Sequence, residues 1–160
     1  MCFHEIEVIS IRGRVALAVT CMIEVCKQWE VHSVKMKAFL SHFQDFTLAR
    51  QLDRWDNEMR MYLPEEDSVG TYASEFGFDH LSLDKQRVIY EMIDALYEVS
   101  QGNLYIGFKN ENTLEPLREM IKIMNENKIN IPPIHPFKKS RITEAGGWGF
   151  AIQYKEFIDK

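Results

Sequence analysis

The sequence predicts an all-α protein, a single-domain helical bundle of about five helices with an extended C-terminal segment. Through most of the first 127 residues, apolar side chains recur at steps of three and four, the spacing of a helix face that packs on a core. This spacing stops after position 129, where three of the five prolines and a Gly-Gly-Trp-Gly run fall. We therefore expect one domain over 1–160, with the 129–160 segment packed on the bundle.

The helix expected at 14–29 is the one around which the others are organised. Its sequence, RVALAVTCMIEVCKQW, is apolar nearly all round and leaves only a narrow polar strip of Thr20, Glu24 and Gln28. A helix with so little polar surface is covered by neighbours on several sides. At about 16 residues, with a charge inside, it is too short to span a bilayer.

The segment before this helix, FHEIEVISI at 3–11, fits two kinds of structure. The alternation of apolar and polar residues fits a strand, whereas the spacing of Phe3, Ile6 and Ile9 fits a helix. We expect a short helical turn here. Gly13 then either breaks or weakens the start of the central helix, because glycine is a poor helix former.

A second helical region follows the turn at Ser33, whose hydroxyl is suited to cap a helix start. Helical spacing runs through 34–51 and continues to Tyr62, with a bend expected near Thr47. Pro64 ends this region, because a proline disfavours helical geometry in the residue before it.

The residues at 64–82 form an acidic connector that is punctuated by glycines, with a short helical turn expected at 71–76. Ser82 then caps a strongly patterned helix at 83–101, and Gly102 supplies its stop. The carboxylates of Glu91, Asp94 and Glu98 lie three and four residues apart on the outer face of this helix. We expect them in water, with ordinary pKa values.

The last third of the chain begins with an apolar run at 104–108 that fits a strand or a buried turn. A further helix is expected to start at 112–113, with Pro116 in its first turn, and to end at Asn127. Beyond it we expect extended structure over the bundle, with a short strand or helix at 150–158.

The net charge of −5 is concentrated in one segment. Residues 53–79 hold two arginines and eight acidic residues, which gives this segment alone a net charge of −6. Nucleic-acid binding requires a basic face, so the distribution disfavours nucleic acid as a direct partner. It is compatible with a basic protein partner, because local charge steers association.

The three cysteines, Cys2, Cys21 and Cys26, include no Cys-x-x-Cys pair. Cys21 and Cys26 are five residues apart on one expected helix and cannot bridge each other, so we interpret them as buried thiols. The first 14 residues contain Glu5 and Glu7 and no long apolar run, unlike a signal peptide. These features predict a cytoplasmic protein without a membrane segment; the sequence leaves the oligomeric state open.

No catalytic, metal or cofactor site is predicted. There is no Glu-x-x-His pair, and His42 with Asp45 is more typical of a surface or cap interaction than of a metal site. There is also no Gly-x-Ser-x-Gly elbow. The glycines at 146–149 lack the preceding strand and following helix of a phosphate loop, so we expect them to give Trp148 room to pack.

The acidic segment is the candidate binding site. Acids interspersed with aromatic residues suit a tight contact with a basic protein, because aromatic side chains supply binding energy while charge supplies rate and specificity. The predicted partner-binding residues are Asp53, Trp55, Asp56, Glu58, Tyr62, Glu65, Glu66, Asp67 and Tyr72.

Three features together give the chain a resemblance to a class of known proteins: the helical body, the acidic 53–79 segment, and the terminal cluster TEAGGWG at 143–149. In these three features the chain resembles bacterial immunity proteins of the polymorphic-toxin and contact-dependent-inhibition kind. Such proteins are small, cytoplasmic and often acidic, and each binds and blocks a cognate toxin domain, frequently a nuclease. The resemblance implies a non-enzymatic inhibitor whose acidic segment covers a basic, substrate-binding cleft.

Three alternatives stay open at this point. A helical adaptor or regulatory module would carry a binding groove on the apolar side of a helix. An enzyme would need a concave pocket with a carboxylate or histidine of perturbed pKa. A purely structural or homo-oligomeric role would need neither feature.

Overall fold

The computed structural model describes residues 4–104 and 109–158 and confirms the all-α prediction. Five helices of the described residues have nine residues or more, in agreement with the expected bundle. The only β-type pairing in the described residues is an isolated bridge between Ile9 and Arg141. In order, the elements are α1 (His4–Glu7), α2 (Ile11–Gln28), α3 (Val34–Asp45), α4 (Leu52–Arg60), α5 (Val69–Phe76), α6 (Leu83–Gln101), α7 (Asn110–Glu126), the 3₁₀ turns η1 (His135–Lys139) and η2 (Ala145–Gly147), and α8 (Lys155–Ile158).

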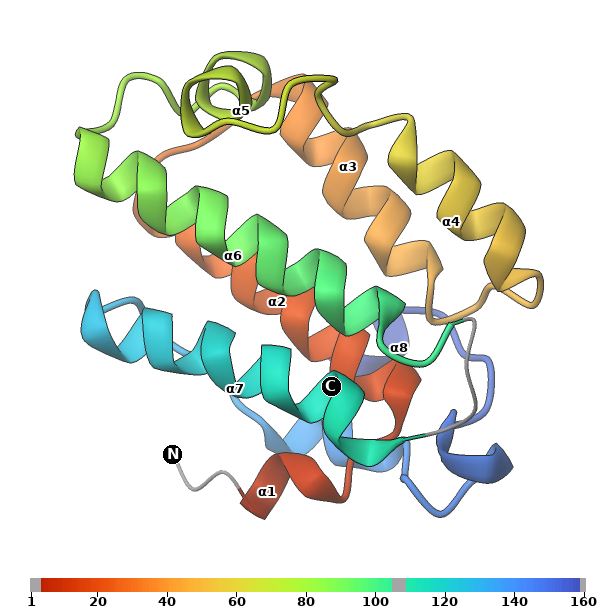
Figure 1. Cartoon of the computed structure of the whole chain (residues 1–160). Coiled ribbons are helices and arrows are strands. Elements are labelled where there is room, and N and C mark those ends of the chain that lie inside the picture. The colour runs from red at the N-terminus through yellow and green to blue at the C-terminus, as the bar shows by residue number, and fades with distance from the viewer. Residues whose placement is uncertain (1–3, 105–108, 159–160) are drawn as a thin grey trace.

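Helix α2 is the centre of the molecule, as its sequence predicts. It packs against α3, α6, α7 and η1, and nearly all of its side chains up to Cys26 are buried. Helices α6 and α7 pack on each other beside α2, α4 lies outside α3, and α5 covers α3 and α6 at one end (Figure 1). None of the helices in the described ranges is long and apolar enough to cross a membrane.

The start of α2 differs from the prediction. The helix begins at Ile11, where the hydroxyl of Ser10 accepts a hydrogen bond from the Gly13 N–H at 3.0 Å. Gly13 lies inside the helix and does not break it. A Cβ at this position would lie 2.5 Å from Cγ2 of Ile9, so the glycine permits close packing of the helix on the preceding turn. The helical turn expected within 3–11 is confirmed for residues 4–7.

The 34–62 region is divided into α3 and α4 by the bend expected near Thr47. The bend is held by the C-terminal segment: the Thr47 hydroxyl donates to the Ile152 carbonyl at 2.7 Å, and the Ile152 N–H donates to the Thr47 carbonyl at 3.1 Å. Phe46 and Thr47 are fully buried. Packing by residues about 100 positions away therefore fixes where the helix stops.

Helix α7 begins at Asn110, two residues earlier than predicted, which places Pro116 inside the helix rather than in its first turn. A proline has no N–H, so the carbonyl of Asn112 lacks its helical partner. This carbonyl packs against Gly102, where a Cβ would lie 2.5 Å from the oxygen. Asn127 ends the helix, as expected. Of the apolar run predicted at 104–108, all but Leu104 lies outside the described residues.

The C-terminal segment packs over α2 as a series of short turns rather than as one extended stretch. Phe137 and Phe157 stack with ring centroids 5.6 Å apart, and both are buried. The hydroxyls of Tyr154 and Thr20 are hydrogen bonded at 2.6 Å, which ties the segment to the polar strip of α2. The element expected at 150–158 is a helix, α8, and not a strand.

A buried arginine joins the N-terminal end of α2 to α7. Arg14 is fully buried, and its guanidinium donates to the Glu7 carbonyl, to the Thr113 hydroxyl, and to both the backbone and the side-chain oxygen of Asn110 at 2.7–3.2 Å. Burial lowers the pKa of Arg14 to about 10. Because four hydrogen bonds hold it, this side chain belongs to the interior of the fold.

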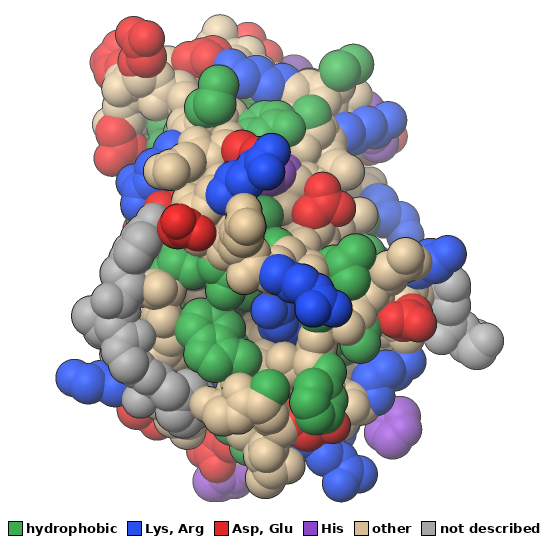
Figure 2. Space-filling view, turned by 90° about the vertical axis from the view of Figure 1, so that its right-hand side faces the viewer, with side chains coloured by type: hydrophobic (Ala, Val, Ile, Leu, Met, Phe, Trp, Pro, Cys, Tyr) green, Lys and Arg blue, Asp and Glu red, His purple; other side chains and the backbone are tan. Residues whose placement is uncertain are grey.

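Charged side chains are unevenly distributed over the surface. On the face drawn in Figure 2, one group of acidic side chains lies at upper left, and other acidic side chains are scattered among lysines, arginines and hydrophobic side chains over the rest of the face. The most exposed large apolar side chains of the described residues are Val34, Met61, Leu83 and Phe150.

Candidate functional site

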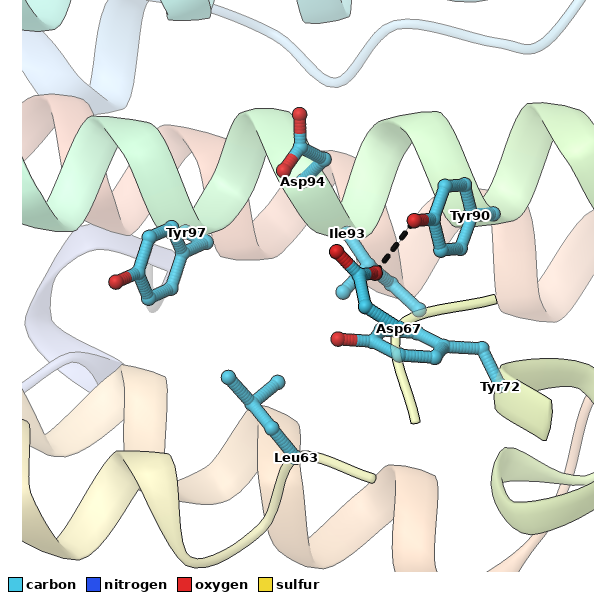
Figure 3. Close-up of a pocket in the computed structure, with 7 residues that line it drawn as sticks. All are labelled: Leu63, Asp67, Tyr72, Tyr90, Ile93, Asp94 and Tyr97. Atoms are coloured by element: carbon cyan, nitrogen blue, oxygen red, sulfur yellow. Dashed lines mark hydrogen bonds between the residues drawn. The ribbon is translucent and has the colours of Figure 1, made fainter. Parts of the chain in front are cut away.

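A pocket of about 230 Å³ opens between α6 and the segment that joins α4 to α5 (Figure 3). Helix α6 supplies one wall, since Tyr90, Ile93, Asp94 and Tyr97 are spaced three and four residues apart and so share a face. The other wall comes from the joining segment and from the first turn of α5. The lining residues are Leu63, Asp67, Tyr72, Tyr90, Ile93, Asp94 and Tyr97.

Local structure fixes the wall opposite α6. The Ser68 hydroxyl caps α5 by accepting from the Thr71 N–H at 3.2 Å, which places Asp67 just before the helix. The Tyr90 hydroxyl donates to Oδ1 of Asp67 at 2.5 Å, and the Tyr72 ring packs edge-on against the Tyr90 ring at 5.0 Å. These contacts hold the joining segment against α6.

The close-up shows how the side chains surround the opening (Figure 3). The Tyr72 hydroxyl and the Asp67 carboxylate point toward the open space, and Asp94 lies on the α6 side of it. Tyr97 and Leu63 close the opposite end. The Asp67 carboxylate and the Tyr72 hydroxyl therefore face the cavity, the Asp94 carboxylate lies at its α6 edge, and the walls combine polar and apolar groups.

The resolved pKa shifts at the pocket are all upward. Partial burial raises the pKa of Asp94, and the nearby charge of Asp67 adds to it. Burial, then the charges of Asp67 and Asp94, raises the pKa of Tyr72. The hydrogen bond to Asp67 is the main cause that raises the pKa of Tyr90 to about 12. Desolvation or a hydrogen bond is the main cause of each shift, and the negative charge of Asp67 adds to all three.

The nearest cationic group is already engaged. The Arg60 guanidinium lies over the Tyr97 ring, 5.5 Å from its centroid, and donates to Asp56 at 3.1 Å and to Gln101 at 3.2 Å. Within the described ranges, no lysine or arginine lines the pocket, and neither Asp67 nor Asp94 forms a salt bridge. The pocket carboxylates thus lack a cationic counterpart from the described part of the chain.

The structure brings two of the predicted partner-binding residues, Asp67 and Tyr72, into this pocket. Glu65 and Glu66 are exposed on the same joining segment. The remaining exposed acids, Asp53 and Glu58, lie on α4, where Glu58 pairs with Arg54 at 3.2 Å. Tyr62 is half-buried and packs against the rings of Phe39 and His42.

The expected surface position is wrong for Trp55 and Asp56. The Trp55 ring stacks on the His42 ring at 5.0 Å, and its N–H donates to the His42 carbonyl at 2.7 Å. Only 1% of Asp56 is exposed, and it accepts a hydrogen bond from Gln101 of α6 at 2.7 Å. Both residues are buried because α4 turns this side toward α3 and α6. They therefore anchor α4 rather than face a partner.

The expectation of ordinary pKa values on the outer face of α6 is also wrong for two of its three acids. All three are exposed, yet partial burial raises the pKa of Asp94, and burial together with the charge of Asp94 raises that of Glu98. The interpretation from sequence missed the pocket residues Tyr90 and Tyr97. The spacing of Tyr90, Asp94 and Tyr97 on one helix face was the available signal.

The other candidates from the sequence have structural roles. Burial raises the pKa of both Cys21 and Cys26 to about 12, so neither is an activated thiol. Nε2 of the His42 ring is hydrogen bonded to the Trp55 carbonyl oxygen at 2.9 Å. Within the described ranges there is no cluster of three histidine, cysteine or acidic residues suited to a metal ion.

The glycines at 146–149 form a tightly packed turn. Gly146, Gly147 and Gly149 have positive φ angles, and a Cβ on Gly149 would lie 2.4 Å from the Ser10 hydroxyl oxygen. Trp148 is half-buried against the core, and its carbonyl accepts from the Arg12 N–H at 3.0 Å. This agrees with the expected role of giving Trp148 room to pack.

Comparison with known proteins finds a distant similarity. No protein-family model and no solved structure matches the chain. Perilipin-5 from sheep (Ovis aries) is similar at 24% identity over 152 residues, which cover 88% of this chain and 33% of perilipin-5. The chain thus spans about a third of the length of that protein. An identity this low does not assign a family, so the functional argument rests on the pocket and its charges.

Proposed function

We propose that this chain is a non-enzymatic binding protein that recognises a basic protein partner through the acidic surface around the α6 pocket. We define this acidic surface by the exposed residues Glu65, Glu66, Asp67, Glu91, Asp94 and Glu98. The observation that carries the proposal is the pair of pocket carboxylates, Asp67 and Asp94, which form no salt bridge within the described residues while tyrosines line the cavity between them.

The pocket carboxylates Asp67 and Asp94 lie near each other without a salt bridge among the described residues. Like charges held near each other cost free energy, and a cationic surface placed against them relieves that cost while steering association. Tyrosine is enriched among residues that dominate binding energy, because it offers a large apolar area with a polar tip. Relative to the sequence prediction, the proposed site keeps Glu65, Glu66, Asp67 and Tyr72 and gains the outer face of α6. It leaves out the predicted residues on or next to α4, which are Asp53, Trp55, Asp56, Glu58 and Tyr62.

We further propose that binding inhibits the partner, in the manner of the immunity proteins that the sequence resembles. An acidic surface laid over a basic cleft would exclude an anionic substrate from that cleft. A toxin domain that acts on nucleic acid is a partner of this kind, because its substrate-binding face must be basic. The cytoplasm is the compartment that fits such a role.

The pocket also meets the condition stated above for an enzyme, since it contains a carboxyl group, Asp94, with a raised pKa. Such a group could serve as a general acid. Binding accounts for more of the site, because catalysis by one carboxyl explains neither the three tyrosines nor the exposed acids Glu65, Glu66 and Glu98 outside the pocket.

The test is affinity capture from a lysate of the source organism, with tagged wild-type chain, a test variant and a control variant. The test variant combines Glu65→Gln, Glu66→Gln and Glu98→Gln. The control removes the same amount of charge from exposed acids outside the acidic surface, through Glu30→Gln, Glu119→Gln and Glu126→Gln. We expect the wild type and the control to retain the same basic protein, and the test variant to bind it at least about tenfold more weakly.

High salt should release the partner, because exposed charges are screened. The purified partner's own activity, measured with and without the chain, then tests inhibition. Retention of the partner by the test variant at wild-type affinity, or failure of the wild-type column to retain any basic protein, would contradict the proposal.

A further inference from the structure

We propose that the α6 pocket receives the ammonium group of one lysine side chain from the partner. This inference deepens the proposed function and rests on it for the source of the lysine. It is carried by a cavity that places two carboxylates beside three tyrosines, with no cation among the described residues that line it.

The size of the cavity fits one side chain. At about 230 Å³ it is smaller than the roughly 300–1,000 Å³ typical of pockets that hold small molecules or cofactors. Leu63 and Ile93 offer apolar contact for a methylene stem, and Asp67, Asp94 and the tyrosine hydroxyls supply polar groups at the same cavity. These walls suit a lysine side chain, which packs its stem along apolar surface and keeps its charge among polar groups.

The chemistry of the walls favours a cation over a neutral group. Carboxylates accept strong, charge-assisted hydrogen bonds from an ammonium group. A cation within about 6 Å of a tyrosine ring is also attracted by the negative face of the ring. Tyr72 and Tyr90 form one side of the cavity and Tyr97 the other, so an ammonium group between them has aromatic surface on both sides.

The arrangement of acceptors favours lysine over arginine. Oδ1 of Asp67 already accepts the Tyr90 hydroxyl, so this carboxylate is less suited to the two parallel hydrogen bonds that a guanidinium prefers. An ammonium group has three donors that can point to separate acceptors. Asp94 lies at the α6 edge of the cavity, whereas the second oxygen of Asp67 and the Tyr72 hydroxyl lie beside each other away from that edge, and these separate acceptors suit that pattern.

The remaining charged groups near the pocket define its rim. Glu98 lies one helical turn beyond Asp94 on α6 and adds negative charge. Arg60 approaches Tyr97 from α4, but its guanidinium is held by Asp56 and Gln101. The incoming lysine therefore meets net negative charge, with one arginine at the edge.

The inference can be tested on the free protein, without the partner. The probes are the blocked amino acids N-acetyl-lysine methylamide, N-acetyl-arginine methylamide and the neutral N-acetyl-norleucine methylamide, titrated into the ¹⁵N-labelled full chain and followed by NMR. We expect the lysine probe to shift amides in 63–72 and 90–98, to bind more tightly than the arginine probe, and to bind at least about tenfold more tightly than the norleucine probe.

Two pocket variants and one control sharpen the measurement. Asp94→Asn keeps the size of the side chain, and Tyr97→Leu removes an aromatic wall; each should weaken the lysine probe severalfold or more. Glu119→Gln makes the same change of charge outside the pocket and should leave the affinity unchanged. Equal affinity for the norleucine probe, tighter binding of the arginine probe, or wild-type affinity in a correctly folded Asp94→Asn protein would overturn the inference.

The same variants separate this inference from the proposed function. If a basic partner is captured by wild type and by Asp94→Asn with equal affinity, and the lysine probe does not bind, the pocket inference fails while the proposed function stands. If the lysine probe binds as expected but no basic protein is captured, the pocket inference stands and the proposed function fails.

Discussion

Two regions of the molecule hold charge in opposite ways. At the start of α2, Arg14 is fully buried and has four hydrogen bonds to acceptors on α7 and on the turn before α2. On α6, Asp94 is exposed beside Asp67 and has no salt bridge within the described residues. The first charge is held by four hydrogen bonds within the protein, whereas the second has no cationic partner within the described residues.

The pKa shifts show that both charges are opposed by desolvation. Burial lowers the pKa of Arg14 to about 10, although the carboxylates of Glu111 and Glu7 partly offset this effect. Partial burial raises the pKa of Asp94, and in this case the nearby charge of Asp67 adds to the shift. The comparison teaches that hydrogen-bonded charge in this protein maintains the fold, while the unpaired charge marks the candidate binding site.

Replacement of Arg14 should have the largest effect on stability. Arg14→Met keeps an apolar stem but leaves the oxygens of Asn110, Thr113 and Glu7 without their donor. Because each buried acceptor left unsatisfied costs about 1–3 kcal/mol, we expect a loss of about 3–5 kcal/mol in the free energy of unfolding. Urea denaturation of the wild type and the variant measures this loss.

Arg50→Met is the matched control, because Arg50 is exposed. It should change the free energy of unfolding by no more than about 0.5 kcal/mol. If Arg14→Met costs as little as the control, the hydrogen bonds of Arg14 do not maintain the fold and the comparison fails.

Asp56 provides a smaller test within the acidic segment. Asp56→Ala removes a buried carboxylate that accepts from Gln101 and Arg60 and so joins α4 to α6. We expect a loss of about 2 kcal/mol, since hydrogen bonds to charged groups contribute about 1.5–3 kcal/mol each and Arg60 is half-exposed. Asp53→Ala, one turn earlier on the exposed side of α4, should cost no more than about 0.5 kcal/mol. Equal losses for the two variants would show that Asp56 behaves as a surface acid.

Local signals in the sequence were enough to identify the long helices and to place the starts of α3 and α6, but not the starts of α2 and α7. Ser33 and Ser82 cap α3 and α6 as predicted, with the hydroxyl of each accepting from the N–H three residues on, at 3.0 and 3.3 Å. The central position of α2 followed from its lack of a polar face. These features depend on residues within one or two helical turns of each other, so they can be recognised from one sequence alone.

The site depended on contacts that no local pattern contains. Asp53 and Asp56 are equally acidic in the sequence, and only the packing of α4 on α3 and α6 buries one and exposes the other. The pocket needs Asp67, in the segment before α5, to meet Tyr90 of α6, which is 23 residues away in the sequence. The sequence placed the negative charge in the segment that supplies one wall of the pocket, but tertiary structure selected which acids line it.

Replacement of Asp94 should have the smallest effect on stability and the opposite sign. The folded-state pKa of Asp94 lies above its ordinary value of 3.8, so the folded state binds more protons than the unfolded state between these two pKa values. Stability from this group therefore falls as pH rises through that window and stays lower above it. Asp94→Asn removes that fall, so the variant should gain slightly in stability relative to wild type at pH 7 and lose this gain near pH 4.

Urea denaturation at pH 4 and pH 7, beside titration with the lysine probe, measures both properties of the same variant. When a residue that maintains the fold is replaced, the protein loses stability, as expected for Arg14 and Asp56. When a residue that serves binding is replaced, the protein binds the lysine probe more weakly, while its stability is maintained or improved. If Asp94→Asn destabilises the protein at pH 7, Asp94 belongs with Arg14, and the distinction between the two regions no longer holds.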